Sequence, residues 1–269
     1  MDVFKFHQGS LPLLVSIPHS GVYIPESIHQ RQTKIGHQLI DTDWHIPELY
    51  NFLEELDCSV IEANYSRYVV DLNRPPDNSS LYPGKKETGI CSAETFMGQR
   101  LYIEGEEPNE EEIKDRKNKY WVPYHEQIRQ ELTRINNEFG YALLWDAHSI
   151  RGFLPLLFEG DLPDLNLGTG NGQSCDEELS NHVYSVMRSS SFEVIRNGRF
   201  KGGYITRNYG NPEKRVHALQ MEISQAAYMS GYPSFELVPE KVATLRPLLK
   251  KIIVALLHNA SDLNGNRPG

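Results

Sequence analysis

The feature that most constrains this chain is an apolar run that leads directly into reactive side chains. Tyr141–Trp145 forms the run, Asp146 and His148 come next, and the loop-forming stretch Ser149–Gly152 follows. A short apolar run bounded by loop residues predicts a buried strand. In open α/β sheets, ligands bind at the carboxyl ends of such strands. We therefore expect His148 at the functional edge of a sheet, with Asp146 on the same side to orient it or to share its ligand.

Strand patterns alternate with helix patterns along the chain. Short β-rich or apolar runs predict strands at Leu13–Ile17, Ser59–Ala63, Arg67–Leu72, Tyr141–Trp145, Phe192–Ile195 and Leu219–Ile223. Apolar residues at helical spacing predict helices at Asp43–Leu56, Glu110–Phe139, Asp176–Arg188 and Val238–His258. Residues 76–108 and 163–172 are expected to be loops. The alternation predicts an α/β fold with a mixed, mostly parallel sheet flanked by helices. No shift in composition divides residues 1–269, so we expect a single domain.

Composition narrows the possible partners. The net charge of -9 and the 39% of hydrophobic residues indicate an ordinary globular protein without the basic face that nucleic acids require. No run approaches the length of a membrane-spanning helix, and the first residues lack the apolar segment of a secretory signal. Cys58, Cys91 and Cys175 are odd in number and far apart, which suits a reducing compartment. We expect a cytoplasmic protein that binds neither nucleic acid nor a membrane.

Two further segments carry side chains that bind metals. His19 comes just after the predicted strand Leu13–Ile17, and Asp41, Asp43 and His45 lie close together in the chain. Imidazole and carboxylate groups are typical zinc ligands. Side chains two residues apart on a helix diverge by about half a turn, so Asp43 and His45 are not expected to share one ion. The start of a helix also favours acids as caps, which explains one of the two aspartates better than both.

Other residues suit substrate recognition and proton transfer. Arg74 follows the predicted strand Arg67–Leu72, and its rigid fork can grip a carboxylate beside Asn73. Glu222 interrupts an apolar run, and burial would raise its pKa, which suits a general base. The segment Arg199–Arg207 combines basic residues with a pair of glycines, which predicts a loop near an anionic ligand.

Several motifs together resemble the N-formylglutamate amidohydrolase family. They are Pro18–Gly21, Asp41–His45, Asp71–Arg74, Leu144–Ser149 and Asn197–Gly203. The resemblance extends over nearly the whole chain and implies hydrolysis of N-formyl-L-glutamate to L-glutamate and formate, which ends one route of histidine degradation. It also implies a fold similar to zinc carboxypeptidases and aspartoacylase.

That wider group uses a His-x-x-Glu pair and a later histidine as metal ligands, a downstream glutamate as base, and an Asn-Arg pair to hold a substrate carboxylate. The resemblance thus assigns His19 and His148 to the metal, Glu222 to the base, and Asn73 with Arg74 to the substrate.

The second metal ligand departs from the pattern of the wider group. Val22 stands where the ligand glutamate would be. We take Asp43 as its replacement, with Asp41 and His45 as alternatives. One zinc ion suits such mixed imidazole and carboxylate ligands, and cobalt, iron or manganese binds the same groups.

These observations predict a metal-dependent amidohydrolase that acts on a small dianionic N-acyl amino acid. Arg74 with Asn73 would hold one substrate carboxylate, and Arg151 or Arg207 would hold the other. The alternative is a related zinc deacylase or peptidase that acts on another N-acyl amino acid.

Overall fold

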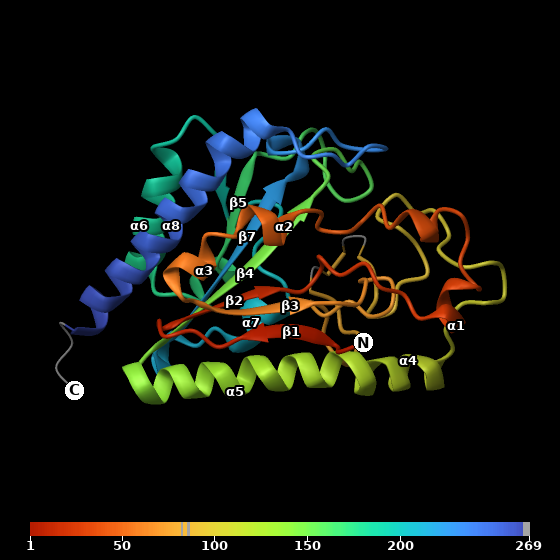
Figure 1. Ribbon diagram of the computed structural model, residues 1–269, viewed down its shortest axis with the longest axis horizontal. Helices are drawn as coiled ribbons and strands as arrows, with labels where there is room; N and C mark the ends of the chain where they lie inside the picture. The colour runs from red at the N-terminus through yellow and green to blue at the C-terminus, as the bar shows by residue number, and fades with distance from the viewer. Residues whose placement is uncertain (82, 85–86, 266–269) are drawn as a thin grey trace.

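Seven strands form one sheet at the centre of the molecule (Figure 1). They are β1 (Phe4–His7), β2 (Leu13–Ile17), β3 (Ser59–Ala63), β4 (Ala142–Ile150), β5 (Leu165–Gly168), β6 (Val194–Arg196) and β7 (Val216–Ser224). The computed structural model describes residues 1–81, 83–84 and 87–265. The strand order is β1-β3-β2-β4-β7-β5-β6. The pairs from β3 through β2 and β4 to β7 are parallel, as is β5 with β6, whereas β1 and β5 run antiparallel to β3 and β7. The predicted mixed, mostly parallel sheet is confirmed.

Helices cover both faces of this sheet (Figure 1). The α-helices of the described residues are α1 (Glu26–His29), α2 (Ile46–Leu49), α3 (Leu53–Leu56), α4 (Glu110–Arg116), α5 (Val122–Phe139), α6 (Glu177–Arg188), α7 (Tyr204–Tyr209) and α8 (Pro239–Gly265). Helix α5 lies along one face, and α6 and α8 lie together on the other. A π-helical turn, Lys117–Trp121, joins α4 to α5. None of the described helices combines the length and the apolar character needed to span a bilayer.

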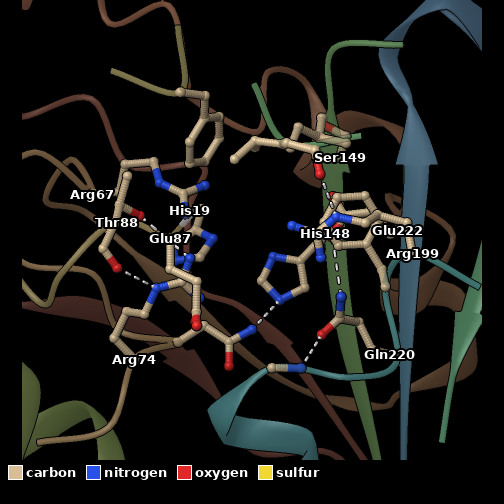
Figure 2. Close-up of a pocket in the computed structure, with 16 residues that line it drawn as sticks. His19, Arg67, Arg74, Glu87, Thr88, His148, Ser149, Arg199, Gln220 and Glu222 are labelled. Atoms are coloured by element: carbon tan, nitrogen blue, oxygen red, sulfur yellow. Dashed lines mark hydrogen bonds between the residues drawn. The ribbon is translucent and has the colours of Figure 1, made fainter. Parts of the chain in front are cut away.

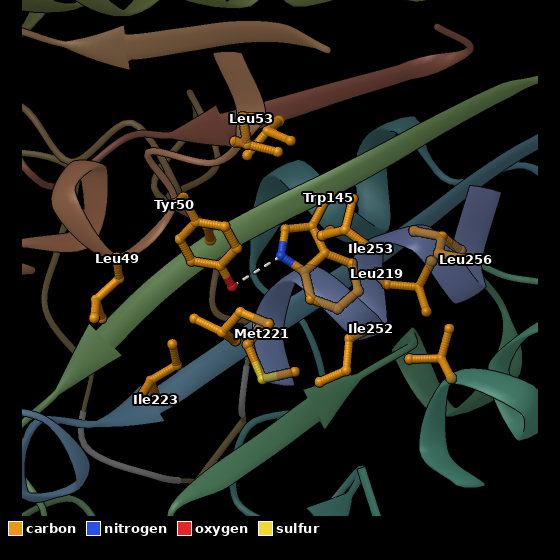
Figure 3. Packing of buried hydrophobic residues seen from close by; sticks show 14 of the residues in the cluster. Leu49, Tyr50, Leu53, Trp145, Leu219, Met221, Ile223, Ile252, Ile253 and Leu256 are labelled. Carbon is orange, nitrogen blue, oxygen red and sulfur yellow. Dashed lines mark hydrogen bonds between the residues drawn. The ribbon is translucent and has the colours of Figure 1, made fainter. Parts of the chain in front are cut away.

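Side-chain alternation along β4 divides the hydrophobic core between the two faces. Every residue of this strand is buried. Leu143 and Trp145 pack in the cluster that includes α6 and α8, whereas Ala142 and Leu144 pack in the cluster that includes α5. The indole N–H of Trp145 donates to the hydroxyl of Tyr50 at 3.1 Å (Figure 3). Burial on both faces explains the uninterrupted apolar run, because neither side of the strand meets water.

Toward the carboxyl ends of β4 and β7, the α5-facing side becomes polar. Asp146 and His148 follow Leu144 on this side of β4, and Gln220 and Glu222 occupy the same side of β7. The sheet register places His148 opposite Glu222 and Asp146 opposite Gln220. The sequence predicts that Asp146 and His148 follow the end of this strand. Strand β4 instead extends to Ile150, so both residues lie inside it.

Four predicted elements differ in the structure. The helix Asp43–Leu56 is wrong, because the left-handed backbone at His45 (φ 60°) delays the start of α2 to Ile46, and turns at Tyr50–Phe52 separate α2 from α3. The strand Arg67–Leu72 is wrong, because this segment forms turns whose β-rich residues are buried in the α5-side core and pair with no strand. The loop 163–172 contains β5, which pairs with β7. The loop Arg199–Arg207 is irregular only as far as Gly203, because α7 begins at Tyr204. The described part of 76–108 is irregular, as expected.

Candidate functional site

Two histidines and an aspartate meet at the carboxyl edge of β2 and β4. His19 follows β2, Asp43 precedes α2, and His148 lies in β4. His148 Nδ1 is 3.0 Å from Asp43 Oδ2, and His19 Nδ1 is 3.7 Å from the same oxygen. All three side chains are buried, and one potential ligand atom from each lies within 4.8 Å of the others. This group could bind a metal ion.

Two more carboxylates orient the histidine rings. His19 Nε2 is 2.8 Å from Asp71 Oδ1, and His148 Nε2 is 2.9 Å from Asp146 Oδ2. Each Nε2–H therefore donates to a carboxylate, and each Nδ1 is directed toward Asp43. Burial alone would raise the pKa of Asp71, but the charges of His19 and of a nearby arginine hold it well below its usual range.

The donor atoms fit a zinc-like ion. The buried Nδ1 of His19 has no hydrogen-bond partner within the described part of the chain, and such buried polar atoms are uncommon in native proteins. A metal ion would satisfy this nitrogen and would be held by Asp43 and His148 as well. Two imidazoles and one carboxylate are a familiar protein ligand set of catalytic zinc, which leaves a position for water.

Arg67 is a buried member of the site whose role was not predicted from the sequence. Its guanidinium donates to Asp71 at 2.7 Å and to Asp43 at 3.4 Å, and it lies 4.6 Å from the ring centroid of Phe96. Burial would raise the pKa of Asp43, but hydrogen bonds from His148 and His19 hold it below its usual range. Arg67 thus balances two buried carboxylates. The available signal was a basic residue at the start of an otherwise apolar run.

Glu222 lies opposite His148 on the neighbouring strand. Its side chain is only 7% exposed, and this burial raises the pKa of the carboxyl to about 8. The amide of Gln220 donates to Glu222 Oε2 at 3.0 Å and accepts the backbone N–H of Gly203 at 2.6 Å (Figure 2). Gln220 therefore connects the carboxylate to the loop before α7. The alternation that identified Glu222 would also have placed Gln220 on the same face.

Asn73 and Arg74 have different roles in the structure. The side-chain N–H of Asn73 donates to Asp146 at 3.0 Å, and its side-chain oxygen accepts the backbone N–H of Ile205 at 2.7 Å. Asn73 therefore holds the start of α7 against β4. Arg74 lines the pocket and donates to the carbonyl and hydroxyl of Thr88 at 2.9 and 3.3 Å (Figure 2). Its guanidinium is placed to meet an anionic group in the pocket.

Aromatic side chains from α5 and from the π-helical turn before it support the loop that carries Arg74. The indole N–H of Trp121 donates to the carbonyl of Arg74 at 3.0 Å, and His125 Nε2 donates to the carbonyl of Leu72 at 2.8 Å. The two rings stack with centroids 3.6 Å apart. Burial lowers the pKa of His125 to about 3, so this ring is neutral. Trp121 is the last residue of the π-helical turn, so the irregular part of the helix lies directly at this contact.

A pocket opens over the cluster and combines charged with apolar walls. Its polar lining includes His19, Arg67, Asn73, Arg74, Glu87, Thr88, His148, Ser149, Arg199, Gln220 and Glu222, and its apolar lining includes Phe96, Ile150, Leu157 and Phe200. Of the residues assigned from sequence, His19, Asn73, Arg74, His148 and Glu222 all line this pocket, and Asp43 contacts both histidines behind it. Arg199 was singled out only as part of a basic loop.

The expected placement of Arg151 and Arg207 beside a ligand is not seen. Neither is among the described residues that line the pocket. Arg151 turns toward Asp41 instead, at 3.0 Å. Arg207 donates to the carbonyls of Gly202 and Leu81, at 2.8 Å each. These contacts hold loops around the pocket, because both guanidinium groups are directed at protein acceptors. Of the alternative ligands, Asp41 pairs with Arg151 and His45 Nε2 bonds to a distant backbone carbonyl at 2.8 Å.

Comparison with known proteins gives a consistent result. The model of the N-formylglutamate amidohydrolase family matches residues 11–229. An N-formylglutamate deformylase from Pseudomonas putida is 46% identical over 256 residues, which cover 95% of this chain and 96% of the relative. A protein of the same name from Pseudomonas aeruginosa is 45% identical, with the same coverage.

Solved structures share the fold. The crystal structure of N-formylglutamate amidohydrolase from Ralstonia eutropha superposes with a TM-score of 0.81 at 23% identity and covers 98% of this chain and 99% of that one. A gene product from Agrobacterium tumefaciens gives 0.69 at 16% identity, over 95% of this chain and 96% of that one. Together with the family model and the close sequence relatives, the site and fold show that this chain belongs to the N-formylglutamate amidohydrolase family.

Proposed function

We propose that this protein hydrolyses N-formyl-L-glutamate to L-glutamate and formate, with one divalent ion, zinc by preference, held by His19, Asp43 and His148. One observation carries the proposal: the buried carboxylate of Glu222 and the guanidinium of Arg74 line the same pocket as the histidines of this ligand cluster. The relatives named N-formylglutamate deformylase support the choice of substrate.

The chemistry needs a nucleophile, a proton acceptor and a held substrate. When bound, the ion would polarise the formyl carbonyl and lower the pKa of a water molecule. Glu222 takes a proton from the attacking water on a carboxylate oxygen as the new C–O bond forms. It returns the proton to the amide nitrogen as the C–N bond breaks, which releases the free amine and formic acid, and the acid then ionises to formate. Its pKa of about 8 suits a group that both accepts and donates near neutral pH.

The other residues of the site hold these groups in place. Gln220 fixes one oxygen of Glu222, and Asp71 and Asp146 fix the two imidazole rings. Arg74 would bind the backbone carboxylate of the substrate through its planar fork. The apolar residues Phe96, Ile150, Leu157 and Phe200 limit the access of water and so strengthen these charged interactions.

A formate assay on a panel of substrates tests the proposal. Purified protein would be stripped with a chelator, reloaded with zinc, cobalt, iron or manganese, and incubated with N-formyl-L-glutamate, N-acetyl-L-aspartate and a dipeptide. We expect formate release from formylglutamate that depends on the added ion. Turnover of acetylaspartate or the dipeptide with no formate release would favour the alternative, a related deacylase or peptidase.

The substrate places the protein at the end of a route of histidine degradation, and a cytoplasmic location stays a prediction. The expected partner is a small dianionic substrate, with no nucleic acid and no membrane.

A further inference from the structure

A second guanidinium faces the same pocket as Arg74. Arg199 belongs to the loop between β6 and α7, far in sequence from the Arg74 loop, and both arginines line the pocket. In Figure 2 they lie on either side of His148. The pocket therefore offers one cation at each side of the proposed reacting centre.

The other pocket arginine, Arg67, is already matched by protein carboxylates. It pairs with Asp71 at 2.7 Å and with Asp43 at 3.4 Å, and all three side chains are buried. Replacing these contacts with substrate contacts would leave buried carboxylates without their counter-charge, which is costly. Arg67 is therefore poorly suited to hold a substrate carboxylate.

Arg199 is fixed by its stem and its ring contact. Its Nε–H donates to the carbonyl of Leu157 at 2.7 Å, and its guanidinium carbon lies 5.2 Å from the ring centroid of Phe200. These contacts set the plane of a group that has five N–H donors in total. Glu87, which also lines the pocket, accepts hydrogen bonds from Ser80 and from the N–H of Leu81, which lie on its own loop.

The wall around Arg199 is apolar. Ile150, Leu157 and Phe200 line the pocket and belong to a separate hydrophobic cluster with Phe96. A charged end group next to an apolar wall suits a ligand whose carboxylate is carried on methylene groups. The side chain of glutamate has this chemistry.

We propose that Arg199 is the specificity-determining residue of the pocket and binds the side-chain carboxylate of the acyl amino acid, while Arg74 binds the backbone carboxylate. This inference rests on the proposed function and adds the residue that selects an acidic amino acid. It assigns to Arg199 the role that sequence reasoning gave to Arg151 or Arg207. A substrate without the side-chain charge would not form the paired, charge-assisted hydrogen bonds that a guanidinium makes to a carboxylate, so the site would favour the dianionic substrate.

The test compares a dianionic with a monoanionic substrate. Values of kcat/KM would be measured for N-formyl-L-glutamate and N-formyl-L-glutamine with the parent enzyme and with Arg199→Gln and Arg199→Lys. For Arg199→Gln we expect about a ten- to hundred-fold loss on formylglutamate, the usual worth of a hydrogen bond to a charged group, and less than about a three-fold change on formylglutamine. Arg199→Lys keeps the charge but loses the fork, so its loss on formylglutamate should be smaller.

The matched control is Arg196→Gln. Arg196 lies three positions away in β6 and donates hydrogen bonds to Ser180 and Asn181 of α6, outside the pocket. Its substitution removes the same charge as Arg199→Gln. It should leave both substrates unchanged. Metal content and thermal unfolding would be recorded for every variant, and Arg199→Lys decides the question if Arg199→Gln does not fold.

An equal loss on both substrates, or no loss on either, would overturn the assignment of Arg199. A failure of the proposed function looks different, because the parent enzyme itself would then release no formate from formylglutamate.

Discussion

The site has two sides that are built by different means. The strand side consists of residues on β4 and β7, namely Asp146, His148, Gln220 and Glu222. The loop side consists of residues on irregular segments, namely His19, Asp43, Arg67, Asp71, Asn73, Arg74 and Arg199. Backbone pairing holds the strand side, whereas side-chain hydrogen bonds such as that from Trp121 to the Arg74 carbonyl hold the loop side. The proposed base thus lies on the sheet, the proposed metal ligands come from both sides, and the pocket arginines lie on loops tied to the sheet.

Loss of the metal should have the largest effect, because the ion would join the two sides. We expect His19→Ala, Asp43→Ala and His148→Ala each to lose bound metal and detectable formate release together. Elemental analysis and a formate assay measure both. His45→Gln is the control, since His45 bonds to a backbone carbonyl away from the cluster. A metal-free His45→Gln protein would contradict the assignment of Asp43.

Glu222→Gln should have the next largest effect and should isolate the strand side. Glutamine keeps the size of the side chain but cannot accept the proton from water. We expect kcat to fall by roughly two to four orders of magnitude, the usual worth of general base catalysis, with metal content unchanged. Near-normal turnover with full metal occupancy would show that another group accepts the proton.

Gly203→Ala tests how tightly the two sides are joined. An added Cβ would lie 2.4 Å from the side-chain nitrogen of Asn73, so either the loop that carries Gly203 or the Asn73 side chain must shift. Overpacking of this kind typically costs about 1–3 kcal/mol, and we expect kcat/KM to fall about ten-fold or more. Gly105→Ala is the control for backbone strain without a clash, because its φ is 83° and no neighbouring atom lies within 4 Å of its added Cβ. Unchanged kinetics for Gly203→Ala would mean that the loop tolerates displacement.

Arg74→Lys affects recognition alone. Lysine keeps the positive charge but loses the planar pair of donors. We expect KM for formylglutamate to rise about ten-fold with little change in kcat. Arg129→Lys on the exposed surface of α5 is the control. A loss confined to kcat would move Arg74 from recognition to the chemical step.

Trp121→Phe should have the smallest effect. It removes the hydrogen bond to the Arg74 carbonyl but keeps a ring to stack on His125. One neutral hydrogen bond contributes about 0.5–1.5 kcal/mol, and we expect KM to rise about three-fold. Trp145→Phe removes a similar bond, to Tyr50 on the other face of the sheet. That variant should unfold at a lower temperature with KM unchanged, and a similar rise in KM for both would contradict a specific support of the loop.

The strand side could be predicted from sequence because alternation is a local property. A polar residue inside an apolar run is visible in one window, as at His148 and Glu222, and the sheet then brings such residues together. The family resemblance added the ligand set and the substrate. The alternation of strand and helix patterns predicted the mixed sheet correctly.

The loop side could not be predicted in the same way, because its contacts join distant segments. His19 bonds to Asp71 across 52 positions, and Arg151 bonds to Asp41 across 110. The turn at Arg67–Leu72 was taken for a strand because its residues are buried, and burial selects the same residue types as a strand. The left-handed backbone at His45 left no signal in the sequence either.

The pairing of His148 with Glu222 has a consequence for how enzymes on this scaffold could diversify. Neighbouring strands lie about 4.8 Å apart, and this spacing is set by backbone hydrogen bonds. A slip by one residue would turn both side chains to the opposite face. The separation of the proposed ligand His148 and the proposed base Glu222 is therefore nearly constant, whatever the neighbouring side chains become. New substrates would have to be accommodated by changes in the length and composition of the surrounding loops, while the reacting pair stays where the sheet holds it.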